Sequence, residues 1–320
     1  METGKKWGMM IAGVMMSAMM CVTTALAASD YPTRFIDLVI PYNPGGGTDL
    51  AVRIYKDKLE KVLGQPVVNM YKPGAGGIIG GTYVKQSKPD GYTLLAIAES
   101  TLVLSMVARK AGYTLDDFTP ICTLVFSPYT FRVKADTPYK TMKDFVQAAK
   151  TKTMKYVTSG VLDDGHLMVE AISRQEGFQA IHVPTVGGAE AMPALLGGHV
   201  DMIVSAPKPA EGQLRTLAVS TGNRWEVEPD VPTLTELGYS IVRANYFSVW
   251  GPKGLPKEIA DKINGAYKKV LEENKQEITK RARAVHQIPH ILTGDQLKKI
   301  SRDTYDFYKV MIPKIGATVK

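Results

Sequence analysis

Apolar residues in this chain fall into short runs that alternate with stripes at helical spacing. Residues 36–40 form an apolar run typical of a buried strand, and Ala51, Ile54 and later apolar positions recur with helical periodicity. The order of strand, glycine-rich or polar loop, and helix is repeated from residues 66–70 and again from 92–98. This rhythm predicts a parallel sheet whose ligand-facing loops lie at the carboxyl ends of the strands.

A second unit of the same kind is predicted after two extended segments within residues 121–133. Thr141 and Asp144 have capping-box spacing, which predicts that a helix begins there. Further strands are expected at residues 155–158, 180–183, 200–204 and 216–220. Residues 246–250 have the pattern of a strand that returns to the first unit. The fold class is therefore expected to be α/β, with two lobes and a ligand cleft between them.

Helices are also predicted towards the C-terminus. Thr233 and Glu236 again have capping-box spacing, which predicts a short helix. Pro256 precedes an apolar stripe that begins at Ile259, and another stripe begins at Leu297. We therefore expect two helices to follow the returning strand.

The first 27 residues have the pattern of a secretory signal peptide. Lys5 and Lys6 precede an apolar stretch, and Ala25-Leu26-Ala27 fits a small-x-small cleavage site. The stretch is shorter than the ~20 residues that span a bilayer, which favours an exported, soluble protein over an anchored one. The expected organisation is a signal peptide at residues 1–27, a first lobe of residues 28–128 plus 246–320, and a second lobe of residues 129–245.

Composition and charge narrow the possible functions. Cys122 is the only cysteine after the signal peptide, so a disulfide framework is excluded, and its apolar neighbours predict a small core residue. The formal net charge is +8, and most of the excess lies from Lys253 onwards. Solvated faces of amphipathic helices explain this charge better than a membrane surface or a partner. Nucleic-acid binding is not expected, because basic and aromatic residues do not interleave.

The segment of residues 41–49, Pro-Tyr-Asn-Pro-Gly-Gly-Gly-Thr-Asp, is the first candidate for chemistry. It joins a strand to a helix N-terminus, where bare N–H groups and the helix dipole favour an anion. Its glycines let an anion approach the backbone. We interpret it as a site for a carboxylate or a similar small anion. The alternative is a tight turn in which Thr48 or Asp49 caps the helix.

Patterns typical of enzymes and cofactor sites fail at specific positions. Residues 74–79 begin like a dinucleotide-binding fingerprint but have Ile79 where its last glycine is required. Gly76 and Gly81 have the spacing of a phosphate-binding loop, but the lysine that should follow is missing. The sequence contains no Gly-x-Ser-x-Gly elbow and no metal-ligand spacing among its five histidines. Binding without turnover is favoured, with no catalytic residue, cofactor or metal expected.

Motifs distributed over the whole chain after the signal peptide resemble one family. They are Tyr31-Pro32 and the segments at residues 44–49 (PGGGTD), 64–68 (GQPVV), 72–77 (KPGAGG), 89–95 (PDGYTLL), 182–184 (HVP), 196–201 (LGGHVD), 217–220 (LAVS) and 229–233 (PDVPT). This ordered set closely resembles the Bug (TctC-like) extracytoplasmic solute receptors of tripartite tricarboxylate-type transporters. The resemblance implies a periplasmic binding protein-like fold, a periplasmic location, a small organic carboxylate ligand, membrane permease subunits as partners, and a monomer.

By this resemblance, one ligand carboxylate lies on backbone amides of residues 44–48 and 74–77, and a second-lobe loop closes on the ligand. The family pattern of that loop is Ser-x-Gly-x-Gly-Ser-x-x-His-Leu, but here Leu162 replaces the second glycine and Asp163 the following serine. Because a carboxylate at a helix N-terminus repels an anion, we hypothesise that the distal end of the ligand is neutral, apolar or cationic. The alternative is that Asp163 only caps its helix and points away from the cleft.

The full set of expected ligand contacts combines both lobes. In the first lobe they are Tyr42, Pro44, Gly45, Gly46, Gly47, Thr48, Asp49, Gly74, Ala75, Gly76, Gly77 and Ser100; in the second lobe they are Ser159, Gly160, Leu162, Asp163, His166, Pro184, Thr185, Gly187 and Ser205. Asp49 is expected to orient its loop, and His166 either touches the ligand or caps or packs within its helix. Two alternatives to a transport receptor are an orphan receptor that feeds a sensor and a secreted enzyme with Asp163 or His166 as acid or base.

Overall fold

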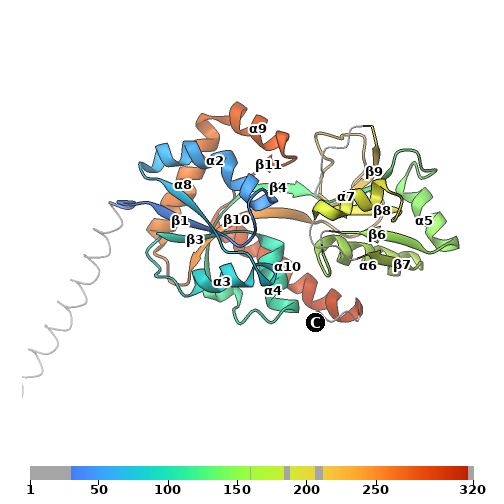
Figure 1. Cartoon of the computed structure of the whole chain (residues 1–320), viewed down its shortest axis with the longest axis horizontal. Coiled ribbons are helices and arrows are strands. Elements are labelled where there is room, and N and C mark those ends of the chain that lie inside the picture. The colour runs from blue at the N-terminus through green and yellow to red at the C-terminus, as the bar shows by residue number, and fades with distance from the viewer. Residues whose placement is uncertain (1–29, 159, 184–187, 206–211, 316–320) are drawn as a thin grey trace, which may run out of the picture.

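The protein contains two sheets, each covered by helices (Figure 1). A computed structural model of the chain describes residues 30–158, 160–183, 188–205 and 212–315. The six-stranded sheet has the order β11-β4-β10-β3-β1-β2, and the five-stranded sheet has the order β7-β6-β8-β5-β9. The prediction of an α/β fold with two lobes is confirmed.

The first lobe is built on the six-stranded sheet. Its strands are β1 (Ile36–Ile40), β2 (Val67–Tyr71), β3 (Thr93–Ala98), β4 (Phe118–Pro128), β10 (Ala244–Pro252) and β11 (Ile288–Pro289). Its helices are α2 (Gly47–Leu63), α3 (Ile78–Lys85), α4 (Glu99–Ala108), α8 (Lys257–Glu273), α9 (Lys275–Ala284) and α10 (Gly294–Ile315), with short 3-10 turns η1 (Ala75–Gly77) and η2 (Leu115–Asp117). Since β1 pairs in parallel with β2 and β3, the loops that follow these three strands share one edge of the sheet.

The second lobe is built on the five-stranded sheet. Its strands are β5 (Thr130–Lys134), β6 (Met154–Val157), β7 (Ala180–Val183), β8 (Met202–Ser205) and β9 (Leu214–Val219), and its helices are α5 (Met142–Thr151), α6 (Asp164–Glu176) and α7 (Gly188–Leu196). Strand β6 pairs in parallel with β7 and β8, whereas β5 is antiparallel to β8 and β9. The loop that carries residues 158–163 therefore leaves the carboxyl end of a central parallel strand.

The two crossings between the lobes lie side by side. Strand β4 ends where β5 begins, and β10 pairs with β4 in an antiparallel register that places Ala244 opposite Pro128. Tyr129 and Arg243 are the residues next to this paired end. The expected division of the chain at residues 128–129 and 245–246 stays a prediction.

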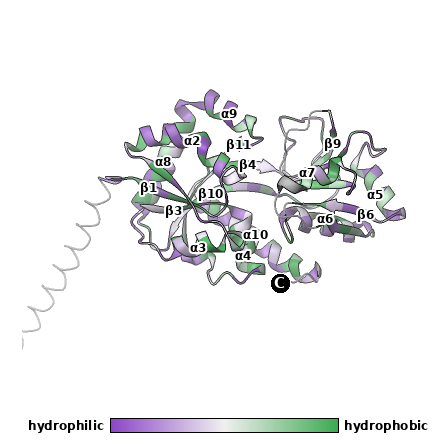
Figure 2. Ribbon diagram, viewed as in Figure 1, coloured by the Kyte–Doolittle hydropathy of each residue, from purple (hydrophilic) through white to green (hydrophobic). Residues whose placement is uncertain are grey.

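Apolar burial follows the predicted strands. In Figure 2 strand β1 has hydrophobic colour, whereas α2 and α9 carry many hydrophilic residues. Cys122 is fully buried in the core of the first lobe, as predicted. One apolar cluster joins the lobes: Leu162 and Leu167, from the start of α6, pack with first-lobe side chains that include Trp250 and Tyr308. The contact surface between the lobes is therefore partly apolar.

Two helix predictions at the C-terminal end need correction. Three helices follow β10 rather than two, because α9 buries only Ile278 and Ala282 and has no long apolar stripe. Thr233 and Glu236 form both capping-box hydrogen bonds, at 2.7 and 3.1 Å, but no helix follows. Gly238 has φ +88°, a left-handed conformation that ends the turn. The capping box of Thr141 and Asp144 is confirmed at the start of α5.

Candidate functional site

The first candidate loop leads from β1 into the N-terminus of α2. Gly46 is the N-cap residue of α2, in an extended conformation, and no side chain caps the helix. The alternative in which Thr48 or Asp49 is the N-cap is therefore wrong. Gly45 has φ +85°, which suits glycine, and both Gly45 and Gly47 are exposed. The first-turn N–H groups of this 17-residue helix lack a side-chain cap, which is the arrangement that binds anions.

Asp49 holds this loop in shape. Its carboxylate is 1% exposed and accepts hydrogen bonds from Gly45 N (2.8 Å), Arg53 Nε (2.9 Å), Tyr71 Oη (2.8 Å) and Asn69 Nδ2 (3.3 Å). Burial raises the pKa of Asp49, but the hydrogen bonds from Arg53, Gly45 and Tyr71 outweigh it and leave the pKa below its ordinary value. These four donors occupy the carboxylate, which explains how an acidic residue sits beside a site for an anion. Its contact with a ligand stays a prediction.

The second candidate loop has left-handed backbone at four successive residues. Gly74, Ala75, Gly76 and Gly77 have φ values of 130°, 47°, 62° and 96°, a run that side chains disfavour and three glycines permit. A Cβ atom at Gly77 would lie 3.4 Å from the hydroxyl of Tyr42, so the two glycine-rich loops are packed together. Burial raises the pKa of Tyr42 to about 12, so its phenol is neutral at physiological pH.

The second-lobe loop is fixed by hydrogen bonds at the start of α6. Leu162 has φ +61° and a fully buried side chain, and its N–H donates to His166 Nδ1 at 3.0 Å. This left-handed backbone explains why glycine suits the position. Asp163 is the N-cap of α6, and its Oδ1 accepts from His166 N at 2.8 Å. The capping role considered for Asp163 is therefore observed. The carbonyl oxygen of Gly160 accepts from Thr158 Oγ1 at 2.8 Å.

A stacked pair of imidazoles, one buried and one half-buried, lies next to this loop. The rings of His166 and His182 stack with centroids 4.0 Å apart, and Thr158 Oγ1 lies 3.0 Å from His182 Nε2. The pKa of both histidines is lowered to about 4, by burial and, for His182, also by the neighbouring His166. Both are neutral at pH 7, and because His166 Nδ1 accepts a hydrogen bond, its proton is on Nε2. His166 therefore packs and accepts within its own lobe, and its contact with a ligand stays a prediction.

The remaining expected contacts divide into buried serines and residues outside the described part. Ser100 lies in the first turn of α4 with its Oγ 3.5 Å from Asn245 Oδ1. Ser205 ends β8 and its carbonyl oxygen accepts from Thr130 Oγ1. Both side chains are buried. The other expected contacts, Ser159, Pro184, Thr185 and Gly187, lie outside the described residues.

The sequence did not reveal a buried charge network between the lobes. Arg243 donates from Nε and Nη2 to Asp164 Oδ1, at 3.1 and 3.0 Å, and Tyr129 donates to Asp164 Oδ2 at 3.0 Å. Arg243 Nη2 also reaches Thr304 Oγ1 at 3.2 Å, and this hydroxyl lies 3.3 Å from Glu99 Oε2. Burial raises the pKa of Glu99 to about 7. These residues are scattered along the sequence without a shared motif, so no local signal marks them.

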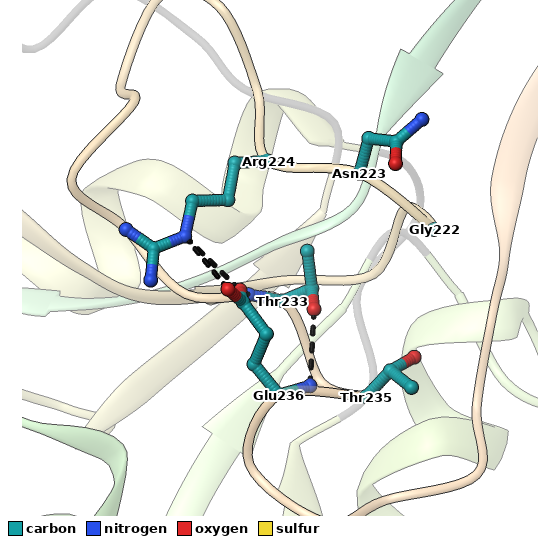
Figure 3. A pocket seen from close by; sticks show the side chains of 6 residues that line it. All are labelled: Gly222, Asn223, Arg224, Thr233, Thr235 and Glu236. Atoms are coloured by element: carbon teal, nitrogen blue, oxygen red, sulfur yellow. Dashed lines mark hydrogen bonds and ion pairs between the residues drawn. The ribbon is translucent and has the colours of Figure 1, made fainter.

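Two hollows of the described surface lie away from the predicted ligand residues. One of about 520 Å³ lies on the second lobe and is lined by Gly222, Asn223, Arg224, Thr233, Thr235 and Glu236 (Figure 3). Arg224 Nε donates to both carboxylate oxygens of Glu236, at 3.0 and 3.1 Å, so the charges in this hollow neutralise each other. The other, of about 560 Å³, is lined by residues of both lobes, among them Phe126 of the first lobe and Asn223 of the second. None of the predicted contacts lines either hollow.

The described residues contain neither a cluster of metal ligands nor a membrane-spanning helix. Within residues 30–315, apart from the gaps given above, no three His, Cys, Asp or Glu side chains lie together as metal ligands require. None of the helices described has the length and apolarity needed to cross a bilayer.

Two α/β lobes joined by paired crossings, with glycine-rich loops at the carboxyl ends of parallel strands, define a two-lobe solute-binding protein. The family described as "Tripartite tricarboxylate transporter family receptor" (TctC) matches residues 51–317, and the chain belongs to this family. The resemblance drawn from the motifs is confirmed. The chain is accordingly a solute-binding receptor of a family whose members are receptors rather than enzymes.

Individual relatives agree with this assignment. The chain is 34% identical over 296 residues to the UPF0065 protein in the gbd 5' region of Cupriavidus necator, with 90% of each chain covered. A TctC solute binding protein from Polaromonas, solved with no ligand, is 31% identical with a TM-score of 0.76, covering 89% of this chain and 99% of that one. The Rpa4515 protein of R. palustris, solved with adipate, is 26% identical with a TM-score of 0.77, covering 90% and 100%.

Proposed function

We propose that this protein is exported to the periplasm, captures a small organic carboxylate between its lobes and delivers it to the permease subunits of a tripartite tricarboxylate-type transporter. It acts as a monomer, without cofactor or catalysis, and the lobes close on the ligand. One carboxylate of the ligand lies on backbone amides of residues 44–48 and 74–77, so that no permanent positive charge is needed. Adipate in the related R. palustris protein supports a carboxylate as the ligand.

The observation that carries the proposal is the start of α2. Gly46 caps the helix without a side chain, Gly45 and Gly47 are exposed, and Asp49 is turned to its own four donors. A carboxylate at such a terminus gains roughly 0.3–2 kcal/mol from the helix dipole and roughly 1.5–3 kcal/mol for each hydrogen bond to a charged group. The N-terminus of α2 is therefore expected to bind an anion, because no side chain of the protein caps it.

The start of α6 differs from that of α2 in a way that bears on the other end of the ligand. Asp163 already places a carboxylate at this terminus and accepts the N–H of His166. A second anionic group there would meet like charge and would find that N–H occupied. The ligand proposed here therefore has one carboxylate at the α2 end and a neutral, apolar or cationic distal end.

A single substitution tests the α2 site. Gly46 has an extended backbone that aspartate adopts readily, and a Cβ atom there would have only an ordinary contact of 3.6 Å with Asn43 O. Gly46→Asp supplies the helix with its own carboxylate cap, worth a few tenths of a kcal/mol relative to a glycine cap. We expect calorimetry to show no carboxylate binding by this variant while its melting temperature is kept or raised. Binding as tight as that of the wild type would contradict the proposal.

The chemistry of the ligand's distal end is tested by comparing hexanoate with adipate, which has the same chain length, and with the shorter succinate. Calorimetry with succinate, adipate and hexanoate is expected to show that hexanoate binds more tightly than either dicarboxylate, and that Asp163→Ser improves dicarboxylate affinity. Asp144→Ser is the matched control, because Asp144 belongs to a capping box at α5 of the same lobe. Micromolar binding of succinate or adipate by the wild type would contradict the hypothesis that the distal end of the ligand is not a carboxylate. Native mass spectrometry of the purified protein would weigh any co-purified ligand, and chemical conversion of a bound carboxylate would remove the receptor interpretation.

A further inference from the structure

Arg243 stands where the chain passes from the second lobe back to the first. Its backbone belongs to the second lobe, because its N–H donates to Ser220 O at 2.7 Å and its carbonyl oxygen accepts from Ser220 Oγ at 2.6 Å. The next residue, Ala244, begins β10 of the first lobe. The guanidinium is therefore carried by the second lobe but is placed at the boundary.

On the second-lobe side the guanidinium forms an ion pair with the start of α6. Two of its nitrogens donate to Oδ1 of Asp164, and the hydroxyl of Tyr129 donates to Oδ2. The Asp164 side chain is fully buried. Asp164 follows Asp163, the cap of α6, and lies within four residues of Gly160. The ion pair therefore holds the same turn of backbone that forms the second-lobe part of the candidate site.

On the other side the guanidinium meets helix α10 of the first lobe. Arg243 Nη2 lies 3.2 Å from Thr304 Oγ1, and its Cζ lies 4.9 and 5.6 Å from the ring centroids of Phe307 and Tyr308. Helix α10 contacts both α4 and α6, and Figure 1 shows it running from the first lobe towards the second. Glu99, at the start of α4, adds a carboxyl group 3.3 Å from the same threonine hydroxyl.

We propose that Arg243 is a positioning residue that latches the start of α6, and with it residues 160–166, against α10 of the first lobe. Its consequence for ligand affinity rests on the proposed function; its consequence for the arrangement of the lobes does not. Asp164 is buried, so loss of the guanidinium leaves an uncompensated charge that gains hydration when the lobes separate. Leu162 and Leu167 supply apolar contact with the first lobe, but such contact is non-directional, whereas the hydrogen bond from Arg243 Nη2 to Thr304 Oγ1 is directional.

The distance between the lobes tests the latch without any ligand. Spin labels on cysteines that replace exposed Lys143 of α5 and Lys280 of α9 report this distance by double electron–electron resonance, and buried Cys122 stays unlabelled. We expect Arg243→Met and the milder Thr304→Val to shift the distribution to longer distances. If Arg243→Met fails to fold, Thr304→Val decides, because it keeps the ion pair of Arg243 with Asp164 and removes the hydroxyl that joins Arg243 to α10 and contacts Glu99. Distributions that coincide with the wild type in the folded variants would overturn the proposal.

Matched controls separate the latch from general loss of stability. Arg215→Met removes a guanidinium that donates only within the second lobe, to the carbonyl oxygens of Ala135, Thr137 and Tyr139. Thr119→Val removes a threonine hydroxyl that donates within the first lobe, to Pro252 O. Both controls are expected to leave the distance distribution unchanged, and a shift of the same size in the controls would overturn the proposal.

Ligand affinity provides the second readout, with hexanoate as the probe. When the wild type binds hexanoate, we expect Thr304→Val to weaken binding roughly tenfold, which corresponds to about 1.4 kcal/mol, and Thr119→Val to leave it unchanged. Equal weakening in both would remove the positioning role in binding. When the wild type does not bind hexanoate, the proposed ligand class is at fault and the distance measurement alone decides the latch.

Discussion

Acidification is expected to destabilise the second lobe through the stacked pair of His166 and His182. Both imidazoles are neutral in the folded protein, and burial lowers the pKa of each to about 4. In the unfolded chain the pKa of histidine is about 6.5, so the unfolded state binds protons first as the pH falls. The stability that the neutral pair contributes is complete above pH 6.5 and is lost as the pH falls from 6.5 towards 4.

The magnitude follows from the two pKa values. Between pH 7 and pH 5 the linkage relation gives a loss in the free energy of unfolding of about 2 kcal/mol per histidine, or roughly 4 kcal/mol for the pair. Part of this loss reflects the hydrogen bond from Leu162 N to His166 Nδ1, because a protonated Nδ1 cannot accept it. Charging either ring also places a positive charge against its partner at a centroid distance of 4.0 Å.

Urea unfolding at pH 7 and pH 5 measures this loss. The double variant His166→Asn, His182→Gln removes both titrating rings, so the difference between wild type and variant cancels the contributions of other titrating groups. We expect the wild type to lose roughly 4 kcal/mol more than the double variant. His199→Gln, at an exposed histidine of the same lobe, is the matched control and should follow the wild type. Equal losses in wild type and double variant would refute the reasoning. So would NMR signals of the His166 and His182 imidazoles that titrate near pH 6.5 in the folded protein.

Four substitutions at three further places test, by unfolding, how a buried carboxyl group, a loop carboxylate and a left-handed residue affect stability. Burial raises the pKa of Glu99 to about 7, so the wild type should lose about 3 kcal/mol relative to Glu99→Gln as the pH rises from 4.5 to 8, and parallel pH profiles would contradict this. Asp49→Asn should cost about 2 kcal/mol through its charged hydrogen bonds, whereas Arg53→Met, whose side chain is 57% exposed, should cost clearly less; equal costs would show that the carboxylate does not organise the loop. Leu162→Gly relieves a left-handed residue but empties a fully buried site, so we expect a net loss of about 2–4 kcal/mol, and a more stable variant would mean that backbone strain dominates.

The parts of the fold that sequence predicted are those governed by local physics. Strands such as β1 and β3 are apolar runs because both faces of a parallel strand are buried, and the capping box at Thr141 is encoded within four residues. Helix α9 escaped prediction because only Ile278 and Ala282 are buried, so its face has too few apolar positions to show a period. The helix expected at Thr233 shows the converse: its capping bonds are local and form, but Gly238 ends the segment.

The parts of the candidate site that the sequence predicted are likewise those set by local backbone. The glycine-rich loops can be recognised in the sequence because left-handed backbone at Gly74, Gly76 and Gly77 restricts the residue type at each position. The groups that hold these loops carry no such mark. Tyr71 reaches Asp49 from 22 residues away, and nothing in its neighbourhood distinguishes it from a core tyrosine. Contacts of this kind depend on tertiary structure, which a single sequence leaves open.

Asp163 and Asp164 show how one turn of helix can serve two purposes. Adjacent residues at a helix start point in different directions, so Asp163 bends back to the N–H of His166 while Asp164 reaches inwards to Arg243 and Tyr129. The first places negative charge at the N-terminus of α6, and the second joins that terminus to Arg243. If Asp163 selects the ligand and Arg243 latches the lobes as proposed, the two roles belong to neighbouring residues of one backbone turn. Each role can then be altered by its own substitution.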